Sequence, residues 1–327
     1  MTSTVVCFGE ALIDFLGLPE STPGAPRLFQ RNAGGAPANV AVATARLGTD
    51  ARFIGMLGDD MFGDFIDSEL RAAGVDIGGV RRTAAAKTAL AFVELADDGE
   101  RSFSFYRPPA ADLLFAPDDF RDADFARCAV FHVCSNSLTG EPSAAATLAG
   151  MRRARDHGAL VSMDLNLRQA LWAPDADIAG RVWPALGEAD LVKLSRSELD
   201  WLNGSDGRDA QTLERLFAAR ARLVVVTDGP ASLHWHVAGA SGTHPVRALD
   251  AIDTTGAGDA FVAGLLHGLV RLGIDAEGLD AFARETEAFP AALTFAAACG
   301  ARATQRHGAF AAMPTRTDID TYLESAR

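Results

Sequence analysis

Short apolar runs alternate with longer segments of helical character along most of the chain. Apolar runs bounded by Gly or polar residues are typical of buried strands, and they predict strands at 4–9, 51–57, 128–134, 160–163, 189–194 and 223–227. Apolar spacing and helix-end residues predict helices over 37–47, 61–73, 142–157 and 260–272. This alternation indicates a doubly wound α/β fold with a mostly parallel central sheet flanked by helices.

The runs 88–95 and 101–106 break this alternation. Both are rich in β-forming residues, and the Ala-Asp-Asp-Gly-Glu segment between them is typical of a hairpin turn. A hairpin inserted in an α/β alternation is not expected to join the main sheet. We therefore expect a single domain over 1–327 with a small β-sheet lid formed by about 15–33 and 87–110, which closes over the site and excludes water. An exposed lid sheet would also allow a homodimer.

Composition and charge narrow the classes of function. Hydrophobic residues make up 48% of the chain and charged residues 22%, which is ordinary for a globular protein. The net charge of −13 argues against nucleic acid or an anionic membrane as the main partner. The four cysteines lack metal-ligand spacing with His, and no apolar stretch has the length of a membrane span. These features favour a cytoplasmic protein that binds small molecules.

One stretch has the character of a phosphate-binding turn. It reads Asp-Thr-Thr-Gly-Ala-Gly-Asp from Asp253 to Asp259 and leads directly into the predicted helix 260–272. Gly256 and Gly258 let a ligand approach the backbone, and a helix N-terminus attracts anions. Because an acid beside a phosphate weakens its binding, Asp259 is either a first-turn helix acid or a base that deprotonates an attacking hydroxyl. We expect the helix terminus to keep Asp259 ionised.

A second group of polar residues follows the first predicted strand. Asp14 comes after that strand, and Gly34-Gly35 precedes Asn39 in the first turn of the next predicted helix. Ligands bind at the carboxyl ends of strands in α/β sheets. A carboxylate accepts from hydroxyls, and an amide offers both a donor and an acceptor. From the residues alone, Asp14 also fits a solvated turn acid, Asn39 a local cap and Gly34-Gly35 an ordinary turn.

The two motifs together resemble the signatures of the ribokinase-like (PfkB-type) carbohydrate kinases, in the family's order. The segments 9–15, 88–93 and 105–114 are most similar to bacterial and plant fructokinases, and the resemblance spans nearly the whole chain. It implies a kinase with ATP as co-substrate, Mg²⁺, and K⁺ in several members. It also implies that Asp259 is the catalytic base and that the backbone of Gly256, Ala257 and Gly258 stabilises the transferring phosphoryl group.

The resemblance implies further roles, each beside a simpler alternative. It implies sugar contacts for Asp14, Gly34, Gly35, Asn39, Phe105, Arg107 and Asn166. It implies nucleotide contacts for Lys193, Thr227, Gly229, Ala297 and Gly308, although the family usually has Asn where Ala297 stands. Arg168 would assist phosphoryl transfer, Glu198 would help hold Mg²⁺ through water, and Asp253 and Thr255 would frame a monovalent-cation site. Ser195 and Glu198 also fit a helix capping box, and Arg107 and Lys193 also fit solvated side chains.

Three functions follow from this resemblance. The first is transfer of the γ-phosphoryl group of ATP to the primary hydroxyl of a ketohexose, with fructose giving fructose 6-phosphate. The second is a 2-keto-3-deoxygluconate kinase, which would use Arg107 and Arg168 as cations for the acid's carboxylate. The third is a non-catalytic sugar- or nucleotide-binding regulator on the same fold. Regulators of this kind typically lose the base or the glycines, and Asp259, Gly256 and Gly258 are all present.

Overall fold

The computed structural model describes residues 3–18, 26–95, 101–107, 109–205 and 207–325. Its centre is a nine-stranded sheet in the order β13-β12-β11-β10-β9-β8-β1-β4-β5. The strands from β11 to β5 are parallel, and β12 and β13 add an antiparallel edge. The bounds are β1 Thr4–Phe8, β4 Ala51–Gly58, β5 Asp76–Thr83, β8 Cys128–Cys134, β9 Leu160–Asp164, β10 Leu191–Ser195, β11 Leu223–Thr227, β12 Leu233–Val237 and β13 Ala240–His244.

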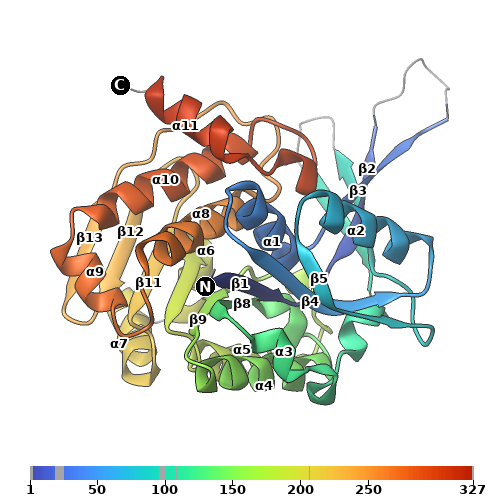
Figure 1. Cartoon of the computed structure of the whole chain (residues 1–327), viewed down its shortest axis with the longest axis horizontal. Helices are drawn as coiled ribbons and strands as arrows, with labels where there is room; N and C mark the ends of the chain where they lie inside the picture. Colours follow the sequence, from blue (N-terminus) through green and yellow to red (C-terminus); the bar gives the residue numbers. More distant parts are fainter. Residues whose placement is uncertain (1–2, 19–25, 96–100, 108, 206, 326–327) are drawn as a thin grey trace.

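Helices cover both faces of this sheet (Figure 1). One core includes residues of α1, α2, α8 and α10, and the other includes residues of α4, α5, α6 and α7. Alternate residues of β11 join opposite cores, with Val225 in the first and Val224 in the second. The bounds are α1 Ala36–Arg46, α2 Met61–Ala72, α3 Asp122–Phe125, α4 Ser143–Asp156, α5 Ile178–Leu186, α6 Arg196–Asn203, α7 Asp209–Ala219, α8 Ala257–Leu272, α9 Leu279–Glu285, α10 Ala288–Ala303 and α11 Arg316–Glu324.

A second, four-stranded sheet has the order β3-β2-β6-β7 and projects from the main body in Figure 1. Its strands are β2 Leu12–Gly17, β3 Phe29–Gly34, β6 Leu90–Leu95 and β7 Arg101–Tyr106. The antiparallel register of β6 and β7 pairs Leu90 with Tyr106 and Leu95 with Arg101, which confirms the predicted hairpin. Its predicted turn at 96–100 lies outside the described residues, as do 19–25 and 108 within the predicted lid segments.

The small sheet begins earlier in the chain than the sequence suggests. The chain leaves β1 at Phe8 and enters β2 at Leu12, where Ile13 pairs with Leu90 of β6. Asp14 therefore lies inside a strand of the small sheet, and the expectation that it stands at the end of a main-sheet strand is wrong. Gly34 likewise ends β3, opposite Leu12, and only Gly35 lies in the turn before α1.

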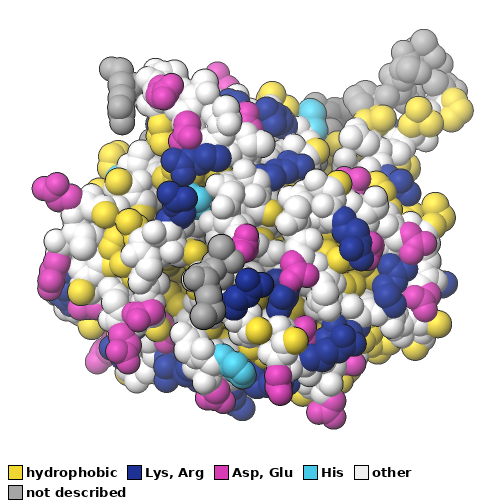
Figure 2. Space-filling view, in the orientation of Figure 1, with side chains coloured by type: hydrophobic (Ala, Val, Ile, Leu, Met, Phe, Trp, Pro, Cys, Tyr) yellow, Lys and Arg dark blue, Asp and Glu magenta, His cyan; other side chains and the backbone are white. Residues whose placement is uncertain are grey.

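The surface carries both signs of charge. On the face shown in Figure 2, acidic and basic side chains are interspersed. Within the described residues, no helix combines the length and apolar character needed to cross a membrane.

Candidate active site

A cavity of about 950 Å³ lies at the carboxyl ends of the parallel strands. Glu10 follows β1, Asn166 follows β9 and Thr227 ends β11, and all three line the cavity. This is the edge at which open α/β sheets bind ligands. The predicted residues that line it are Asp14, Gly35, Asn39, Phe105, Asn166, Arg168, Lys193, Glu198, Thr227, Gly229, Thr255, Gly256, Ala257, Gly258, Asp259 and Ala297, whereas Gly34, Arg107, Asp253 and Gly308 are outside the lining.

The turn before α8 forms one end of the cavity. Gly256 caps the helix in the left-handed region, with φ of 75°, which favours glycine. A side chain at Gly256 would also come within 2.5 Å of Met313 Cε. The helix begins at Ala257, whose N–H donates to the Thr254 carbonyl at 3.2 Å. Because first-turn N–H groups lack partners inside the helix, this terminus presents a positive end to the cavity.

Asp259 is buried in the first turn of α8. Asn39 donates from Nδ2 to one carboxylate oxygen of Asp259 at 2.7 Å, and Asn166 donates from Nδ2 to the other at 3.3 Å. Burial raises the pKa of Asp259 to about 7; the nearby Asp164 also raises it, while the Asn39 hydrogen bond and the positive charges of Arg168 and Lys193 lower it. We expected the helix terminus to keep Asp259 ionised; its pKa of about 7 leaves it only partly ionised at neutral pH, because burial disfavours the charged form.

Lys193 lies beside the glycine turn. Its Nζ is 3.1 Å from both carboxylate oxygens of Asp164 and 3.2 Å from the position that a Cβ on Gly258 would occupy. Burial opposes its charge, but the carboxylates of Asp164 and Glu198 raise the pKa of Lys193 above its usual value. The structure therefore places a buried ammonium group against the turn, and not at the surface.

Asp14 and Gly34, two of the predicted sugar-binding residues, lie against each other. Burial raises the pKa of Asp14 to about 7, and the charges of Asp253 and Asp259 add to this. Gly34 packs against the Asp14 carboxylate so closely that any side chain there would collide with it. Gly35 has φ of 107°, and a Cβ would lie 2.6 Å from the Glu10 carbonyl oxygen. Both glycines are therefore required by the packing around Asp14 and Glu10.

Glu198 is fixed by its own helix and by a neighbouring loop. One carboxylate oxygen accepts the N–H of Ser195 at 2.7 Å, and the other accepts the N–H of Leu167 at 2.8 Å. Ser195 accepts the N–H of Glu198 in return, which confirms the capping box. The carboxylate also lines the cavity, so capping and a role toward a ligand are compatible.

Asp253 joins two loops behind the glycine turn. It accepts the N–H of Thr255 at 2.7 Å and the N–H of Gly308 at 3.1 Å. His307 Nδ1 lies 3.6 Å from the same carboxylate. Gly308, predicted as a nucleotide contact, therefore lies with its N–H against Asp253, and this pair links the two loops.

Arg107 is buried, and the expectation of an exposed strand-end side chain is wrong. It is 1% exposed and donates from Nε and Nη2 to one oxygen of Asp112, at 2.8 and 2.6 Å. Its third contact is Thr139 Oγ1 at 3.0 Å. The guanidinium group is engaged by protein groups and does not line the cavity.

Sequence reasoning missed several polar residues that line the cavity, among them Glu10 and Asn136. Both are buried, and Asn136 donates to Glu10 at 2.9 Å. Each follows the carboxyl end of a main-sheet strand, β1 or β8. The rule that ligands bind at this edge was the available signal for both.

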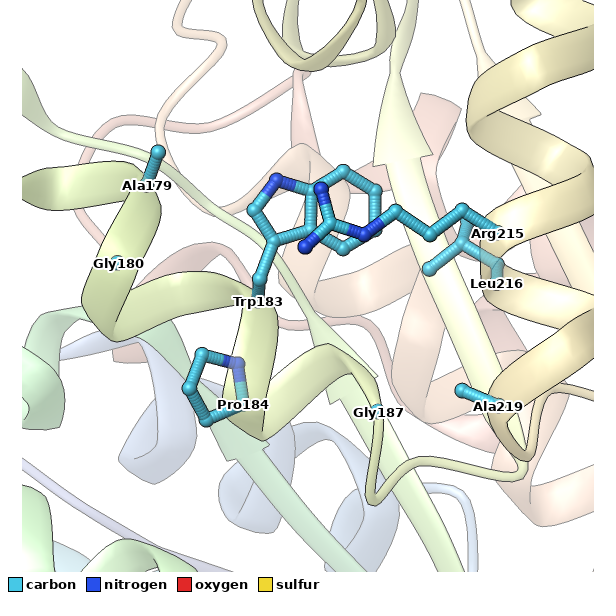
Figure 3. Close-up of a pocket in the computed structure, with 8 residues that line it drawn as sticks. All are labelled: Ala179, Gly180, Trp183, Pro184, Gly187, Arg215, Leu216 and Ala219. Carbon is cyan, nitrogen blue, oxygen red and sulfur yellow. The ribbon is translucent and has the colours of Figure 1, made fainter.

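A second cavity, of about 660 Å³, lies between α5 and α7 (Figure 3). The guanidinium group of Arg215 stacks over the Trp183 ring, with Cζ 3.6 Å from the ring centroid. Among the described residues, the other side chains that line it are Ala179, Gly180, Pro184, Gly187, Leu216 and Ala219. The described residues that line this cavity include no carboxylate or histidine.

Comparisons with known proteins agree with this geometry. Residues 2–316 match the model of the pfkB family carbohydrate kinases. The chain is 42% identical to fructokinase-1 of Oryza sativa subsp. japonica over 324 residues, covering 98% of both chains. It is 48% identical to the structure of a Xylella fastidiosa fructokinase with bound ATP, with a TM-score of 0.94 and coverage of 100% and 99%.

A more distant solved structure extends the comparison. The chain is 32% identical to a Vibrio cholerae O395 fructokinase bound to fructose, ADP and calcium ion, with a TM-score of 0.84 and coverage of 98% and 99%. The expected fold, a mostly parallel α/β sheet with a smaller β-sheet, is confirmed by these neighbours. From the family match and the extent of these similarities, the chain belongs to the pfkB family of carbohydrate kinases.

Proposed function

We propose that the protein transfers the γ-phosphoryl group of ATP to the primary hydroxyl of fructose, giving fructose 6-phosphate. The observation that carries the proposal is a buried carboxylate, Asp259, at the N-terminus of α8 beside the glycine turn. A base and an anion-binding backbone are thereby adjacent, as phosphoryl transfer to an alcohol requires. Relatives named fructokinase match over almost the full chain, and one solved relative holds fructose with ADP.

The proposed reaction begins with Asp259 taking the proton of the sugar hydroxyl. A pKa of about 7 suits a base that must accept a proton near neutral pH and pass it on. Asn39 and Asn166 each donate to one carboxylate oxygen of Asp259, which holds the carboxylate in one orientation toward the cavity. The backbone at Gly256 to Gly258, with Lys193 nearby and Arg168 at the exposed rim, would stabilise charge on the transferring group.

We propose that Mg²⁺ accompanies ATP and that Glu198 faces it through water. Each carboxylate oxygen of Glu198 accepts one backbone N–H, which holds the carboxylate in place. Because each oxygen has a second lone pair, both can still accept a hydrogen bond from water. The described residues contain no group of three or more His, Cys, Asp or Glu that would bind a metal directly. Water and phosphate oxygens are the ligands that Mg²⁺ favours in such sites, and they fit this arrangement. The ion would neutralise phosphate charge during transfer.

The monovalent-cation site stays a proposal at Asp253 and Thr255. Asp253 is buried at 3% exposure and joins the turn before α8 to the loop at Gly308. A K⁺ ion held here would act on the shape of the anion-binding turn and would not contact the sugar. The test is activity in K⁺ compared with the large organic cation tetramethylammonium.

Nucleotide contacts are proposed along the other half of the cavity. Thr227, Gly229 and Ala297 line it, and Gly229 has a left-handed backbone with φ of 52°. Ala297 presents only a methyl group, so the adenine would meet an apolar wall there instead of an amide. Gly308 does not line the cavity, so it would affect nucleotide binding only through its hydrogen bond to Asp253, which holds its loop against the turn before α8.

The arrangement favours a neutral sugar over 2-keto-3-deoxygluconate. A keto-acid kinase was expected to bind the acid's carboxylate with Arg107 and Arg168. Arg107 is committed to Asp112 and lies outside the cavity lining, which removes one of those two cations. Asp14, Glu10 and Asp259 line the sugar-binding part of the cavity, and their carboxylates suit hydroxyl donors better than an anion.

Further proposals concern the assembly. We propose that 1–327 is one kinase domain and that the small sheet is its lid, because Phe105 of β7 and Asp14 of β2 both line the cavity. Exposed apolar side chains on this sheet, Phe29 and Tyr106, would support pairing with a second copy. A cytoplasmic location is supported by four cysteines that are all free and buried.

The test is Mg²⁺-dependent ATP consumption with fructose, glucose, ribose, tagatose, adenosine and 2-keto-3-deoxygluconate. Turnover of fructose above the others, with Asp259→Asn lowering kcat on the order of 10²–10⁴-fold, supports the proposal. Turnover of the keto-acid alone would replace the substrate and keep the mechanism. Binding of ATP and sugar without any turnover would indicate the regulator, and near-normal turnover by Asp259→Asn would remove the base assignment.

A further inference from the structure

Two opposite charges lie side by side at the carboxyl ends of β9 and β10. Asp164 and Lys193 are paired in the parallel register of these strands, and Lys193 Nζ lies 3.1 Å from both carboxylate oxygens. Leu191, two residues before Lys193, belongs to the core that includes residues of α8. Because alternate residues of a strand face the same side of a sheet, Lys193 faces the α8 layer as well. An ion pair therefore stands on a sheet face that is otherwise packed with apolar side chains.

The pair lies against the glycine turn at the start of α8. A Cβ on Gly258 would be 3.2 Å from Lys193 Nζ and 3.9 Å from Asp164 Oδ2, so the missing side chain leaves room for both groups. Both residues line the large cavity, with side chains that are 2% exposed for Asp164 and 9% for Lys193. The ammonium group is thus next to the turn, and its carboxylate partner comes from the adjacent strand.

Stability alone does not account for this pair. Burial penalises each charge, and a buried ion pair is often no more stabilising than apolar residues of the same size. The N-terminus of α8 is itself positive, so an ammonium group beside it is unfavourable without a carboxylate. The same ammonium group attracts a phosphate at the turn. The arrangement suits an enzyme that keeps a positive charge beside the turn before its anion arrives.

We propose that Asp164 is a positioning residue for phosphoryl transfer: it holds the Lys193 ammonium group beside the glycine turn, where the positive charge stabilises the phosphoryl group in transit. Among the described residues, Asp164 provides the only hydrogen-bond acceptors of Lys193 Nζ. An ammonium group has three N–H donors, and its contacts to two oxygens of Asp164 fix its direction. This inference rests on the proposed kinase function and deepens it, because it names the residue on which the action of Lys193 depends.

The test is a double-mutant cycle in which kcat and KM are measured with ATP and the accepted sugar. Lys193→Met removes the charge and should lower kcat about 10²–10³-fold. Asp164→Asn leaves the ammonium group misplaced and should lower kcat about 10- to 100-fold, with KM for sugar nearly unchanged. The double variant should be no less active than Lys193→Met, because an unpaired Asp164 carboxylate would only repel phosphate. Losses that multiply in the double variant would overturn the proposal.

The pH dependence of kcat/KM separates an action at the site from a loss of packing. Burial is the main cause of the raised pKa of Asp259; the Asp164 charge raises it further, and the charges of Arg168 and Lys193 lower it. The other titratable groups that interact with Asp259 are Asp14 and the neutral thiols of Cys7 and Cys134.

The two single variants should therefore shift the pH dependence in opposite directions. Asp164→Asn should move the rise of kcat/KM to lower pH, and Lys193→Met should move it to higher pH. A purely structural pair would give no such opposition. If kcat/KM rises over the wild-type pH range in both variants, the pair does not act on the reaction and the proposal is refuted.

Asp124→Asn is the matched control for the loss of a buried ion pair. Asp124 is 3% exposed and accepts from Arg81 Nη2 at 2.8 Å, but neither residue lines the cavity. This variant should lower the melting temperature and keep the wild-type kcat and pH dependence. If Asp124→Asn lowers kcat as much as Asp164→Asn does, the effect is a general consequence of lost stability and the positioning role falls.

Melting temperatures are measured beside the activities. If an unpaired charge prevents Asp164→Asn from folding, the comparison of Lys193→Met with the double variant still decides, since a further loss of kcat in the double variant contradicts the proposal. Wild-type turnover is measured first, so that the two proposals fail separately. Turnover of a sugar other than fructose moves the cycle to that sugar, whereas no turnover of any sugar refutes the kinase function and this inference with it.

Discussion

Asn39, in the first turn of α1, donates a 2.7 Å hydrogen bond to Asp259, in the first turn of α8. Each helix begins at a glycine turn, Gly35 or Gly256, and the bond joins these two turns across 220 residues of sequence. It also stabilises the ionised form of Asp259 against burial. The bond therefore connects the sugar-binding motif to the protonation of the proposed base.

Asn39→Leu should shift the pH dependence of the reaction upward. A base must be deprotonated, so kcat/KM should rise with pH through about 7 in the wild type, following the pKa of Asp259. Because the Asn39 bond lowers that pKa, its removal should move the rising limb up by about one to two pH units. The measurement is kcat/KM for the accepted sugar between pH 5 and 9, in steps of about half a unit.

Asn166→Leu serves as the matched comparison. Its bond to Asp259 is longer, at 3.3 Å, and should contribute less to the ionised form. Asn166→Leu should therefore shift the rise of kcat/KM with pH by less than Asn39→Leu does. The affinity for sugar should fall in both variants, because both residues are proposed sugar contacts. If kcat/KM rises over the same pH range in wild type and Asn39→Leu, a group other than Asp259 controls the pH dependence.

Asp259→Asn should stabilise the fold at neutral and alkaline pH while it abolishes most activity. The folded-state pKa of about 7 exceeds the ordinary Asp value of 3.8, so the folded state binds more protons than the unfolded state between these two pH values. Stability from this group is therefore present below pH 3.8 and is lost as pH rises through about 7. Asparagine does not titrate and avoids this loss.

The measurement is the melting temperature of both proteins from pH 4 to 8.5, in a pH-independent ionic strength. The advantage of Asp259→Asn should increase with pH and level off above the pKa of about 7. Asp14 is present in both proteins, but the charge of Asp259 contributes to its raised pKa, so Asp259→Asn also lowers the pKa of Asp14 and adds to the variant's advantage at high pH. An advantage that stays constant with pH would contradict the titration.

Gly256→Ala should damage both stability and turnover, and Gly273→Ala provides its control. Both glycines cap α8 with positive φ, 75° and 68°. A Cβ on Gly273 meets nothing within 4 Å, whereas a Cβ on Gly256 lies 2.5 Å from Met313 Cε. Gly273→Ala should cost about 1 kcal/mol from backbone strain alone. Because Met313 Cε is the end of a flexible side chain that can move aside, Gly256→Ala should cost about as much stability as Gly273→Ala. It alone should lower kcat, since Gly256 lies in the proposed phosphate-binding turn. Unfolding curves and turnover assays compare the two variants, and an equal loss of kcat in both would contradict this account.

Arg107→Met should destabilise the protein without a specific loss of sugar affinity. The substitution leaves Asp112 buried without its cation, which typically costs about 3–5 kcal/mol. Arg107→Met with Asp112→Leu removes both charges and should recover most of this loss. Urea unfolding measures the recovery. A large rise in KM for sugar in the folded double variant would instead place Arg107 in the binding site.

The central sheet could be predicted because its strands are buried on both faces. β8 at Cys128–Cys134 and β11 at Leu223–Thr227 have the predicted bounds, since their apolar runs end sharply. β5 at Asp76–Thr83 was not predicted, because an edge strand with alternating exposure tolerates Gly and Arg.

The catalytic part of the site could be predicted where the functional residues are contiguous at a turn that begins a helix. The turn at Gly256 and its Asp259 belong to this class. Other features depend on tertiary structure that no local pattern reveals. Arg107 folds back onto Asp112, and Asp14 lies in a strand because β2 pairs with the distant β6. The raised pKa of Asp259 comes mainly from its burial, which the local sequence does not reveal.

The residues proposed to contact the sugar belong to two separate sheets. Asp14 and Phe105 lie on β2 and β7 of the small sheet, whereas Asn166 follows β9 of the main sheet and Asp259 begins α8. Under the proposed function, a sugar that contacts both groups would link the small sheet to the main sheet and complete the wall of the cavity. Water is too small to bridge them. The proposed function would then favour a sugar over water as phosphoryl acceptor because only a molecule of that length reaches both groups.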